Sequence, residues 1–429
     1  MNWIIAAKMM QVVLGFFVGI YSARYLGPSN YGIINYTASY IAFLTIIAGL
    51  GIDDYIMKEM IDHKDQQGEA LGSGILLRII SGLLSVVALY CILMITDAND
   101  SMIQTVAFLQ VISLLFSSGQ LLAYWYQMQL RSKVPSVITS IAYALMTVYK
   151  IVILVQGKDI RYFAFTGSLE TLLIVILLLL QYKKDGGPKL SFSKAMCKDL
   201  LKNSYHFVLS GLLVVVFNST DKIMLKQMMS ETTVGYYSIA SNLCNMWPFV
   251  LSAIIQSASP LILQAKKDSE ELYIRRIKQC YASIIWISIV VSTIITIGAP
   301  YIINLLYGKD YAGSVSSLRI LTWAITFSYL GVARGAWIVS EGLQKYVKYL
   351  TGIGAILNII MNYFLIPVYG AAGASIATLA TQIIVNFVAP LFIKELRPNS
   401  LLIVDAFCMK DVIKPSTVKT TLKELFHKK

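Results

Sequence analysis

Long apolar runs alternate with short polar connections along most of the chain. Each run holds about 20 residues, the length that an α-helix needs to cross the roughly 30 Å hydrocarbon core of a bilayer. We therefore expect an all-α, polytopic membrane protein. The pattern predicts twelve spans, with boundaries near residues 3–24, 33–56, 73–96, 103–126, 135–155, 161–182, 205–226, 236–263, 281–305, 316–340, 346–367 and 372–394.

Lysine and arginine are concentrated in alternate connections between these spans. Connections after the even-numbered spans are basic, and the one at residues 183–202 alone carries six lysines. Because cytoplasmic loops carry the excess of Lys and Arg, both termini are predicted to be cytoplasmic. The net charge of +13 is therefore explained by the basic cytoplasmic connections and does not indicate nucleic-acid binding. Connections after the odd-numbered spans hold only Arg24, Lys158, Arg161, Lys226 and Lys309.

The composition supports this class and argues against several others. Hydrophobic residues make up 57% of the 429 residues and charged residues 14%, against about 25% charged in soluble proteins. The five cysteines and three histidines are scattered, so neither a disulfide framework nor a metal site is predicted. The sequence has no GxxxxGKS/T, HExxH or GxSxG motif, which argues against direct ATP use and soluble-enzyme chemistry.

Two stretches far apart in the chain follow the same plan. Aligning Gly32 with Gly235 sets YGIINYTAS over VGYYSIASN. We therefore predict two six-helix halves, residues 1–182 and 204–394, joined by a basic cytoplasmic linker at 183–203, as in transporters built from parallel repeats. The pair Gly27-Pro28 is expected to end the first helix in a tight outer turn. Gly32, Gly235, Gly370 and Gly373 are expected to remove side chains where the next helix restarts beside its neighbour, and the small residues of GAAGASIAT to allow close helix packing.

The remaining segment, residues 395–429, is predicted to be a cytoplasmic tail. It begins with an amphipathic piece, Leu401 to Met409, and ends in a Lys-rich stretch. An amphipathic helix followed by lysines is typical of a segment that lies on the membrane surface.

Ionisable side chains inside the spans are the candidate functional groups, because each costs about 2.5–3.5 kcal/mol to insert and usually faces a bundle interior or a water-filled cavity. Glu170 is the deepest, near the middle of the sixth span. It is interpreted either as a proton- or cation-binding site or as a structural carboxyl group bonded to a neighbouring helix. Lys150 lies near the outer end of the fifth span, and Arg334 more than a turn inside the tenth.

The seventh span carries a mostly polar stripe in which Ser210, Val214, Asn218, Lys222 and Lys226 recur every fourth residue. Such a stripe suits the wall of a hydrated cavity. The alternative is that both lysines extend outward to the membrane interface.

Charged residues near the span ends are interpreted differently from those inside the spans. Arg24, Arg78 and Arg319 are expected to extend to the interface, and Asp53 and Asp54 to pair with the nearby Lys58.

Four motifs resemble one known family. They are ARYLGPSNYG at residues 23–32, DKIML followed by VGYYSIAS, YGKDYAGSVSSLRIL before the tenth span, and LNIIMNYFLIPVYGAAGASIATLATQ at 357–382. Together they are similar to the polysaccharide-biosynthesis flippases, the Wzx-type exporters of O-antigen and capsule repeat units in the MOP exporter superfamily. The sequence differs from the family pattern at its start. Members of the family commonly have a short basic segment before the first span, whereas here only Met1 and Asn2 precede it. A truncated start is therefore an open alternative.

The resemblance implies a function: transfer of an undecaprenyl-pyrophosphate-linked oligosaccharide from the inner to the outer leaflet of the bacterial inner (plasma) membrane by alternating access. We expect no cofactor or metal, and coupling to a proton or sodium gradient. Expected partners are membrane lipids, a polysaccharide polymerase and glycosyltransferases. The predicted substrate-binding residues are Arg334, Lys150, Lys222, Asn218 and Arg24, and the predicted coupling carboxylates are Glu170 and Asp221.

Two other functions compete with this one. A multidrug or cation antiporter of the same fold group would place acidic groups deep in its cavity, whereas basic groups outnumber carboxylates in these spans. A membrane polysaccharide polymerase would need a sizeable outward loop with catalytic groups, and none is visible in the sequence. The sugar, the polysaccharide served, the coupling ion and the oligomeric state are not encoded in these patterns.

Overall fold

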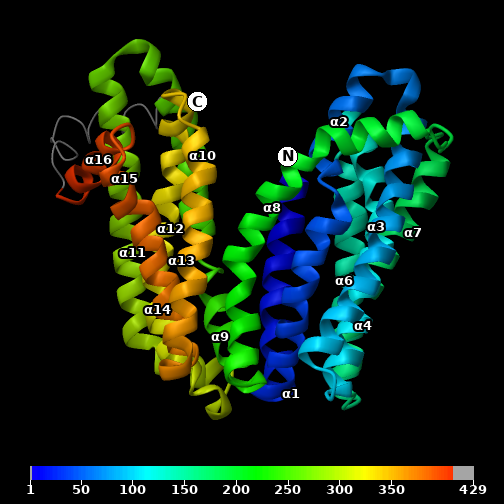
Figure 1. The fold of residues 1–429 in the computed structure, drawn as a ribbon, viewed down its shortest axis with the longest axis horizontal. Coiled ribbons are helices and arrows are strands. Elements are labelled where there is room, and N and C mark those ends of the chain that lie inside the picture. The colour runs from blue at the N-terminus through cyan, green and yellow to red at the C-terminus, as the bar shows by residue number, and fades with distance from the viewer. Residues whose placement is uncertain (1, 409–429) are drawn as a thin grey trace. The chain divides into compact units, whose positions relative to one another are not determined.

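The computed structural model describes residues 2–408, apart from the side chains of residues 2–13 and of residue 54. All regular elements in this part of the chain are helical (Figure 1). Eleven helices among the described residues are long and apolar enough to cross a membrane. The first of them is two helices merged across a kink, so each of the twelve predicted spans has a counterpart. The chain is a multi-pass α-helical membrane protein, as predicted.

The chain divides into two compact units. The first unit comprises Met1–Gly235 and Leu306–Asp310. In it α4 packs against α7, and α1 contacts α4, α6 and α8. Its helices are α1 (Asn2–Gly49), α2 (Ile52–Asp62), η1 (Lys64–Gln66), α3 (Gln67–Thr96), α4 (Ser101–Ser117), η2 (Ser118–Leu121), α5 (Leu122–Met128), α6 (Lys133–Val155), α7 (Ile160–Lys184) and α8 (Lys194–Met228).

The second unit comprises Tyr236–Leu305 and Tyr311–Lys429. Its α14 packs between α12 and α13. The three boundaries between the units fall inside α9 (Glu231–Cys244), before the last residue of α11 (Glu270–Leu306), and inside η3 (Lys309–Tyr311). The other elements of this unit are α10 (Phe249–Asp268), α12 (Ser314–Ser340), α13 (Lys345–Tyr369), α14 (Ala371–Ile383), the π-helical segment η4 (Ile384–Val388), α15 (Ala389–Phe392) and α16 (Arg397–Phe407).

Local sequence explains where the helices break. Gly27 has φ 71° and ψ 171°, a conformation that favours glycine, and Pro28 follows it, so the predicted break in the first helix is confirmed. The seventh predicted span starts earlier than expected, because the Ser193 side chain caps α8 by accepting from the Met196 amide at 3.3 Å. The C-terminal part of the predicted linker is therefore helical. The eighth predicted span is broken between α9 and α10, where Pro248 precedes α10.

The two glycines that the sequence alignment pairs, Gly32 and Gly235, contact one another's segments. A Cβ atom at Gly32 would overlap the carbonyl oxygen of Glu231 and lie 3.0 Å from the amide nitrogen of Gly235. A Cβ atom at Gly235 would in turn overlap the carbonyl oxygen of Pro28. The predicted close approach at these motifs is thus reciprocal. The division of the chain into halves at residues 183–203 concerns the sequence repeat and stays a prediction.

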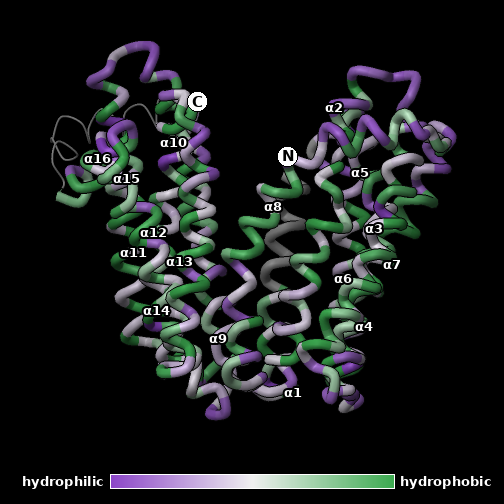
Figure 2. The backbone as a smooth tube through the Cα atoms, in the orientation of Figure 1, coloured by the Kyte–Doolittle hydropathy of each residue, from purple (hydrophilic) through white to green (hydrophobic). Residues whose placement is uncertain are grey.

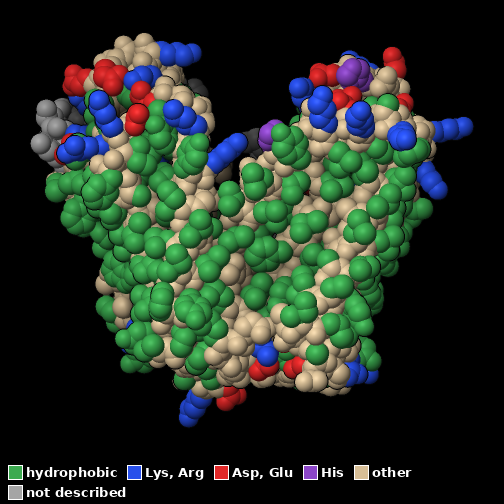
Figure 3. Space-filling view, in the orientation of Figure 1, with side chains coloured by type: hydrophobic (Ala, Val, Ile, Leu, Met, Phe, Trp, Pro, Cys, Tyr) green, Lys and Arg blue, Asp and Glu red, His purple; other side chains and the backbone are tan. Residues whose placement is uncertain are grey.

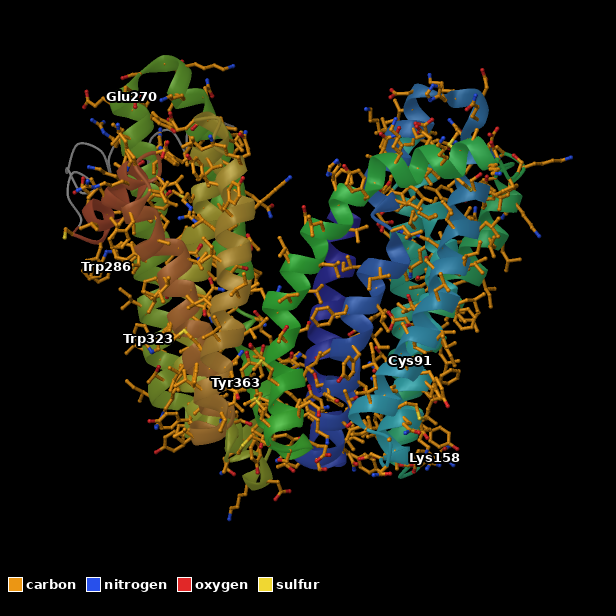
Figure 4. The ribbon with its side chains drawn as sticks, viewed as in Figure 1. Cys91, Lys158, Glu270, Trp286, Trp323 and Tyr363 are labelled. Atoms are coloured by element: carbon orange, nitrogen blue, oxygen red, sulfur yellow. The ribbon has the colours of Figure 1, made fainter. Side chains whose placement is uncertain are left out.

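The basic connections of the first unit lie at one of its ends. Tyr55 of α2 donates to Asp199 of α8 at 3.0 Å, and Arg131 after α5 pairs with Asp185 after α7 at 3.1 Å. Lysine and arginine gather at this α2 end (Figure 3), while Lys158 lies at the opposite end (Figure 4). Between the two ends the helices are largely hydrophobic (Figure 2). We call the α2 end the basic end of the first unit.

The second unit shows the same grouping. Lys266, at the end of α10, pairs with Glu341, just after α12, at 2.9 Å. The basic connections after the eighth and tenth predicted spans therefore share one end of this unit. That the basic ends are cytoplasmic stays a prediction.

The tail helix α16 is docked on the second unit. Asn399 is fully buried and donates to Tyr281 of α11 at 2.7 Å, and Lys278 of α11 pairs with Asp405 at 2.7 Å. The ring of Trp286, labelled in Figure 4, stacks on that of Phe407. These contacts fix α16 to α11. The Lys-rich end of the predicted tail lies outside the described residues.

Candidate functional site

Two of the predicted site residues, Lys150 and Glu170, are brought together inside the first unit. Lys150 lies on α6 and Glu170 on α7, two helices that pack against one another. Both side chains are half-buried, and each lies within electrostatic reach of the other. Tyr143 of α6 is also within reach of Glu170. Each charge therefore offsets part of the cost of burying the other.

The polar stripe of α8 is only partly available for a ligand. Asn218 is exposed, but its side-chain amide donates to the carbonyl of Val214 on its own helix at 2.9 Å. Lys222 is half-buried, whereas its neighbour Asp221 is buried at 2% exposure. The predicted coupling carboxylate is therefore held inside the first unit.

Lys226 does not extend to the interface, so that interpretation is wrong for this residue. Its ammonium group pairs with Glu231 at 2.9 Å and with Asp97, at the end of α3, at 3.7 Å. Tyr36 of α1 donates to Asp97 at 2.6 Å and accepts from Gln227 at 2.6 Å. We call these residues the Asp97 network. It joins α1, α3, α8 and α9 at the end of the first unit opposite to the basic end.

The network was not predicted from the sequence, because Asp97 has the position of an ordinary residue in a connection. The available signal was a carboxylate directly after one apolar run and a lysine near the end of another. Partial burial raises the pKa of the Glu231 carboxyl, but the hydrogen bond and the charge of Lys226 and a backbone hydrogen bond together outweigh burial, and the pKa lies below its usual value.

Arg78 and Asp53 also depart from expectation. Arg78 is only 6% exposed and does not reach the interface, because its guanidinium pairs with Asp53 and donates to the carbonyl of Gly49 at 3.3 Å. Asp53 therefore pairs with Arg78 rather than with Lys58. The pair lines a polar cavity of about 390 Å³ inside the first unit.

Arg334 is the most deeply buried cation among the predicted site residues. It lies on α12 at 4% exposure and donates to the carbonyl and side-chain oxygens of Asn386 at 3.2 and 3.3 Å. Asn386 belongs to the π-helical segment η4, a type of element often found at functional sites. Among the described residues, no carboxylate lies within ion-pair distance of Arg334, and its Nε atom has no hydrogen-bond partner.

Arg24 occupies a more exposed place. It lies one turn before the kink of α1, in the first unit, with its Nε atom 3.9 Å from the Cβ position of Gly308. The structure thus groups Lys150 with Glu170 and Asp221 with Lys222 in the first unit, and places Arg334 in the second.

Among the described residues every regular element is a helix, and eleven helices are long and apolar enough to cross a membrane, which is the architecture of a multi-pass membrane protein. The family of the chain is shown by its amino-acid sequence. The chain belongs to the polysaccharide biosynthesis protein family, whose model matches residues 1–266.

Curated relatives are distant. The chain is 21% identical over 391 residues to a putative O-antigen transporter of Escherichia coli (strain K12), an alignment that covers 89% of this chain and 92% of that protein. It is 24% identical over 231 residues to the uncharacterized membrane protein YabM of Bacillus subtilis (strain 168), which covers 50% of this chain and 43% of YabM. The chain thus spans less than half of the length of YabM.

Solved structures agree on the fold. The lipid II flippase MurJ in an inward closed conformation matches with a TM-score of 0.74 at 17% identity, covering 95% of this chain and 92% of MurJ. An inward-facing multidrug resistance transporter of the MATE family, in the MOP superfamily, matches with a TM-score of 0.66 at 15% identity, covering 91% and 95%. The predicted MOP/MATE-like fold is therefore confirmed.

Proposed function

We propose that the protein is a flippase that moves an undecaprenyl-pyrophosphate-linked oligosaccharide from the cytoplasmic to the outer leaflet of a bacterial inner membrane. It acts by alternating access and serves the synthesis of a surface polysaccharide such as O-antigen, capsule or exopolysaccharide. Membership of the polysaccharide biosynthesis family and similarity to a putative O-antigen transporter over most of its length support this function.

The observation that carries the proposal is the environment of Arg334. A guanidinium cannot be deprotonated inside a protein, and a charge buried among apolar helices is costly without a counterion. Arg334 is nine-tenths buried and meets only the neutral oxygens of Asn386 among the described residues. An anionic headgroup such as pyrophosphate would supply the missing negative charge.

Coupling and partners follow from the same proposal. Glu170 is the carboxylate to load with a proton or sodium ion, because it is a half-buried acid inside a span and lies within electrostatic reach of Lys150. Asp221, beside Lys222, is the second candidate. Glycosyltransferases would supply the lipid-linked substrate, and a polymerase on the other side of the membrane would consume it.

Charge removal at Arg334 tests the proposal. Surface polysaccharide is measured in a strain that lacks the gene and carries it on a plasmid. Arg334→Gln keeps a hydrogen-bonding side chain but loses the charge, and should lower export by about tenfold or more, the effect of about 1.4 kcal/mol. Arg334→Lys should retain more export than Arg334→Gln.

The matched control is Arg275→Gln, at a half-exposed position on α11 where the arginine pairs with Glu271, which should leave export unchanged. Protein abundance is measured for each variant by immunoblot. Export that persists without the gene would end the proposed function. Normal export by Arg334→Gln would remove Arg334 from it.

A further inference from the structure

The cavity beside Arg78 is a second polar site, which no predicted site residue occupies. It has a volume of about 390 Å³ and is lined by residues of α1, α2, α3, α4, η2, α5, α6 and α7 of the first unit. A volume of this size falls within the range of small-molecule sites. Hydrogen-bonding side chains line much of it: Thr45, Asp53, Arg78, Ser117, Gln120, Tyr124, Gln127 and Thr139.

The charges of the lining residues cancel. Arg78 and Asp53 are the charged residues among those that line the cavity, and they form an ion pair. A pyrophosphate would have to compete with Asp53 for Arg78, and a metal ion would face the guanidinium. The cavity therefore favours a neutral, strongly hydrogen-bonding ligand over an anion or a cation.

Part of the hydrogen-bonding capacity of the lining residues is unused. Arg78 is nine-tenths buried, and its Nε atom has no hydrogen-bond partner among the described residues. Asp53 keeps 42% of its side chain exposed, and Gln127 is also exposed. An amide side chain both donates and accepts, a carboxylate accepts and a guanidinium donates. This combination matches a ligand with many hydroxyl groups, each of which can donate and accept.

We infer that this cavity is a saccharide subsite that holds sugar residues of the lipid-linked substrate. The inference rests on the proposed function and adds to it a place for the sugar that is separate from the cation Arg334. Gln120 and Gln127 bond the hydroxyl groups, Asp53 and Arg78 bond them as a fixed pair, and Tyr124 contributes an aromatic face. The lining includes the first turns of α2 and α6 at the basic end. The cavity would therefore bind the sugar on the predicted cytoplasmic side, before the substrate is transferred across the membrane.

Photo-crosslinking in cells tests this subsite whichever sugar the substrate carries. The photoreactive amino acid p-benzoylphenylalanine replaces Gln127 in the full-length protein. After irradiation, mild acid cleaves the pyrophosphate bond to the sugar, and mass spectrometry reads what remains on the peptide. We expect glycosyl mass increments at position 127. They should vanish in a strain that lacks the glycosyltransferase that begins the repeat unit.

The control is the same replacement at Gln156, an exposed residue just after α6 at the opposite end of the first unit. It should give no glycosyl adduct. A variant at position 127 that still supports export but carries no adduct, or only phospholipid, would overturn the subsite. The proposed function would stand in that case, because it fails only if deletion of the gene leaves export intact.

Because the bulky photoreactive side chain could itself block the cavity, a second experiment uses smaller substitutions. The double variant Gln120→Ala/Gln127→Ala should lower export by about tenfold at normal abundance, as expected for the loss of a few hydrogen bonds to the sugar. Gln156→Ala should not change export. Normal export by the double variant would also overturn the inference.

Discussion

At the scale of single residues, Asp97 shows how a membrane protein keeps a carboxylate inside a helical bundle. Its side chain is 3% exposed, and it accepts hydrogen bonds from Tyr36 at 2.6 Å and Thr96 at 2.7 Å. Lys226 lies 3.7 Å away and supplies the opposite charge. Because a buried carboxylate is costly unless paired and hydrogen-bonded, Asp97 depends on these partners.

Removal of Lys226 should therefore destabilise the first unit strongly. Lys226→Met leaves Asp97 buried without its cation and should cost about 3–5 kcal/mol, the range for breaking one half of a buried pair. Thermal unfolding of the purified protein in detergent measures the loss. Adding Asp97→Asn should recover part of it, whereas Lys309→Met, at an exposed site, should change little. Equal stability of Lys226→Met and the native protein would contradict this account.

The Glu231 carboxyl makes one contribution to stability pH-dependent. Its usual pKa of 4.5 is lowered in the folded protein, where partial burial raises the pKa but the hydrogen bond and charge of Lys226, together with a backbone hydrogen bond, lower it by more. A lowered folded pKa stabilises the folded state above the unfolded pKa, and this contribution is lost as pH falls through the folded value. The melting temperature of Glu231→Gln should therefore lie below that of the native protein at pH 7, and the gap should close as pH falls below about 4. A constant gap across this range would show that the charge is not involved.

At the scale of elements, the break in α1 depends on one residue. Gly27 has a positive φ, and nothing lies within 4 Å of a Cβ atom placed there. Glycine is therefore required at this position by the backbone conformation and not by the packing of neighbouring atoms.

Gly27→Ala should consequently cost about 1–3 kcal/mol of backbone strain. Gly19→Ala is the matched control, because Gly19 lies in the regular part of the same helix and also has free space around its Cβ position. There alanine should be neutral or stabilising by up to about 1 kcal/mol. Melting curves of the two variants test the contrast, and similar values for both would refute the strain.

The number and order of the helices could be predicted because apolar length is a strong signal. Their ends were less predictable, since they depend on single groups such as the Ser193 cap of α8. Pairings across helices were the least predictable. Arg78 lies five residues inside a predicted span, and only the packing of α3 against α2 shows that it meets Asp53 rather than the interface.

The candidate site was predicted in part for the same reason. Hydropathy identified Lys150, Glu170 and Arg334 as charges inside spans, but it does not tell which spans are neighbours. The approach of Lys150 to Glu170 follows from the packing of α6 on α7. The cavity beside Arg78 consists largely of Gln, Thr and Tyr side chains, which carry no periodic or charged signal in the sequence.

At the scale of the whole molecule, the orientation in the membrane is open to a direct test. Cys408 is exposed just after α16, and Lys158 lies in the connection between α6 and α7. If the positive-inside rule holds for this chain, a membrane-impermeant maleimide should label Cys408 in inside-out vesicles only, in a background without the accessible Cys91 and Cys197. In the same background with Lys158→Cys and without Cys408, it should label right-side-out vesicles only. The reverse pattern would invert the predicted topology.

The reciprocal contact of Gly32 and Gly235 bears on which substitutions the two segments tolerate together. Each glycine leaves room for the backbone of the other's segment, so a methyl group at either position presses on the same narrow gap. Once one of them has been replaced and the gap has widened, the second replacement should meet less resistance than it would alone. The free-energy costs of substitutions at Gly32 and Gly235 are therefore expected to be non-additive. Replacement of both glycines should cost less than the sum of the two single replacements.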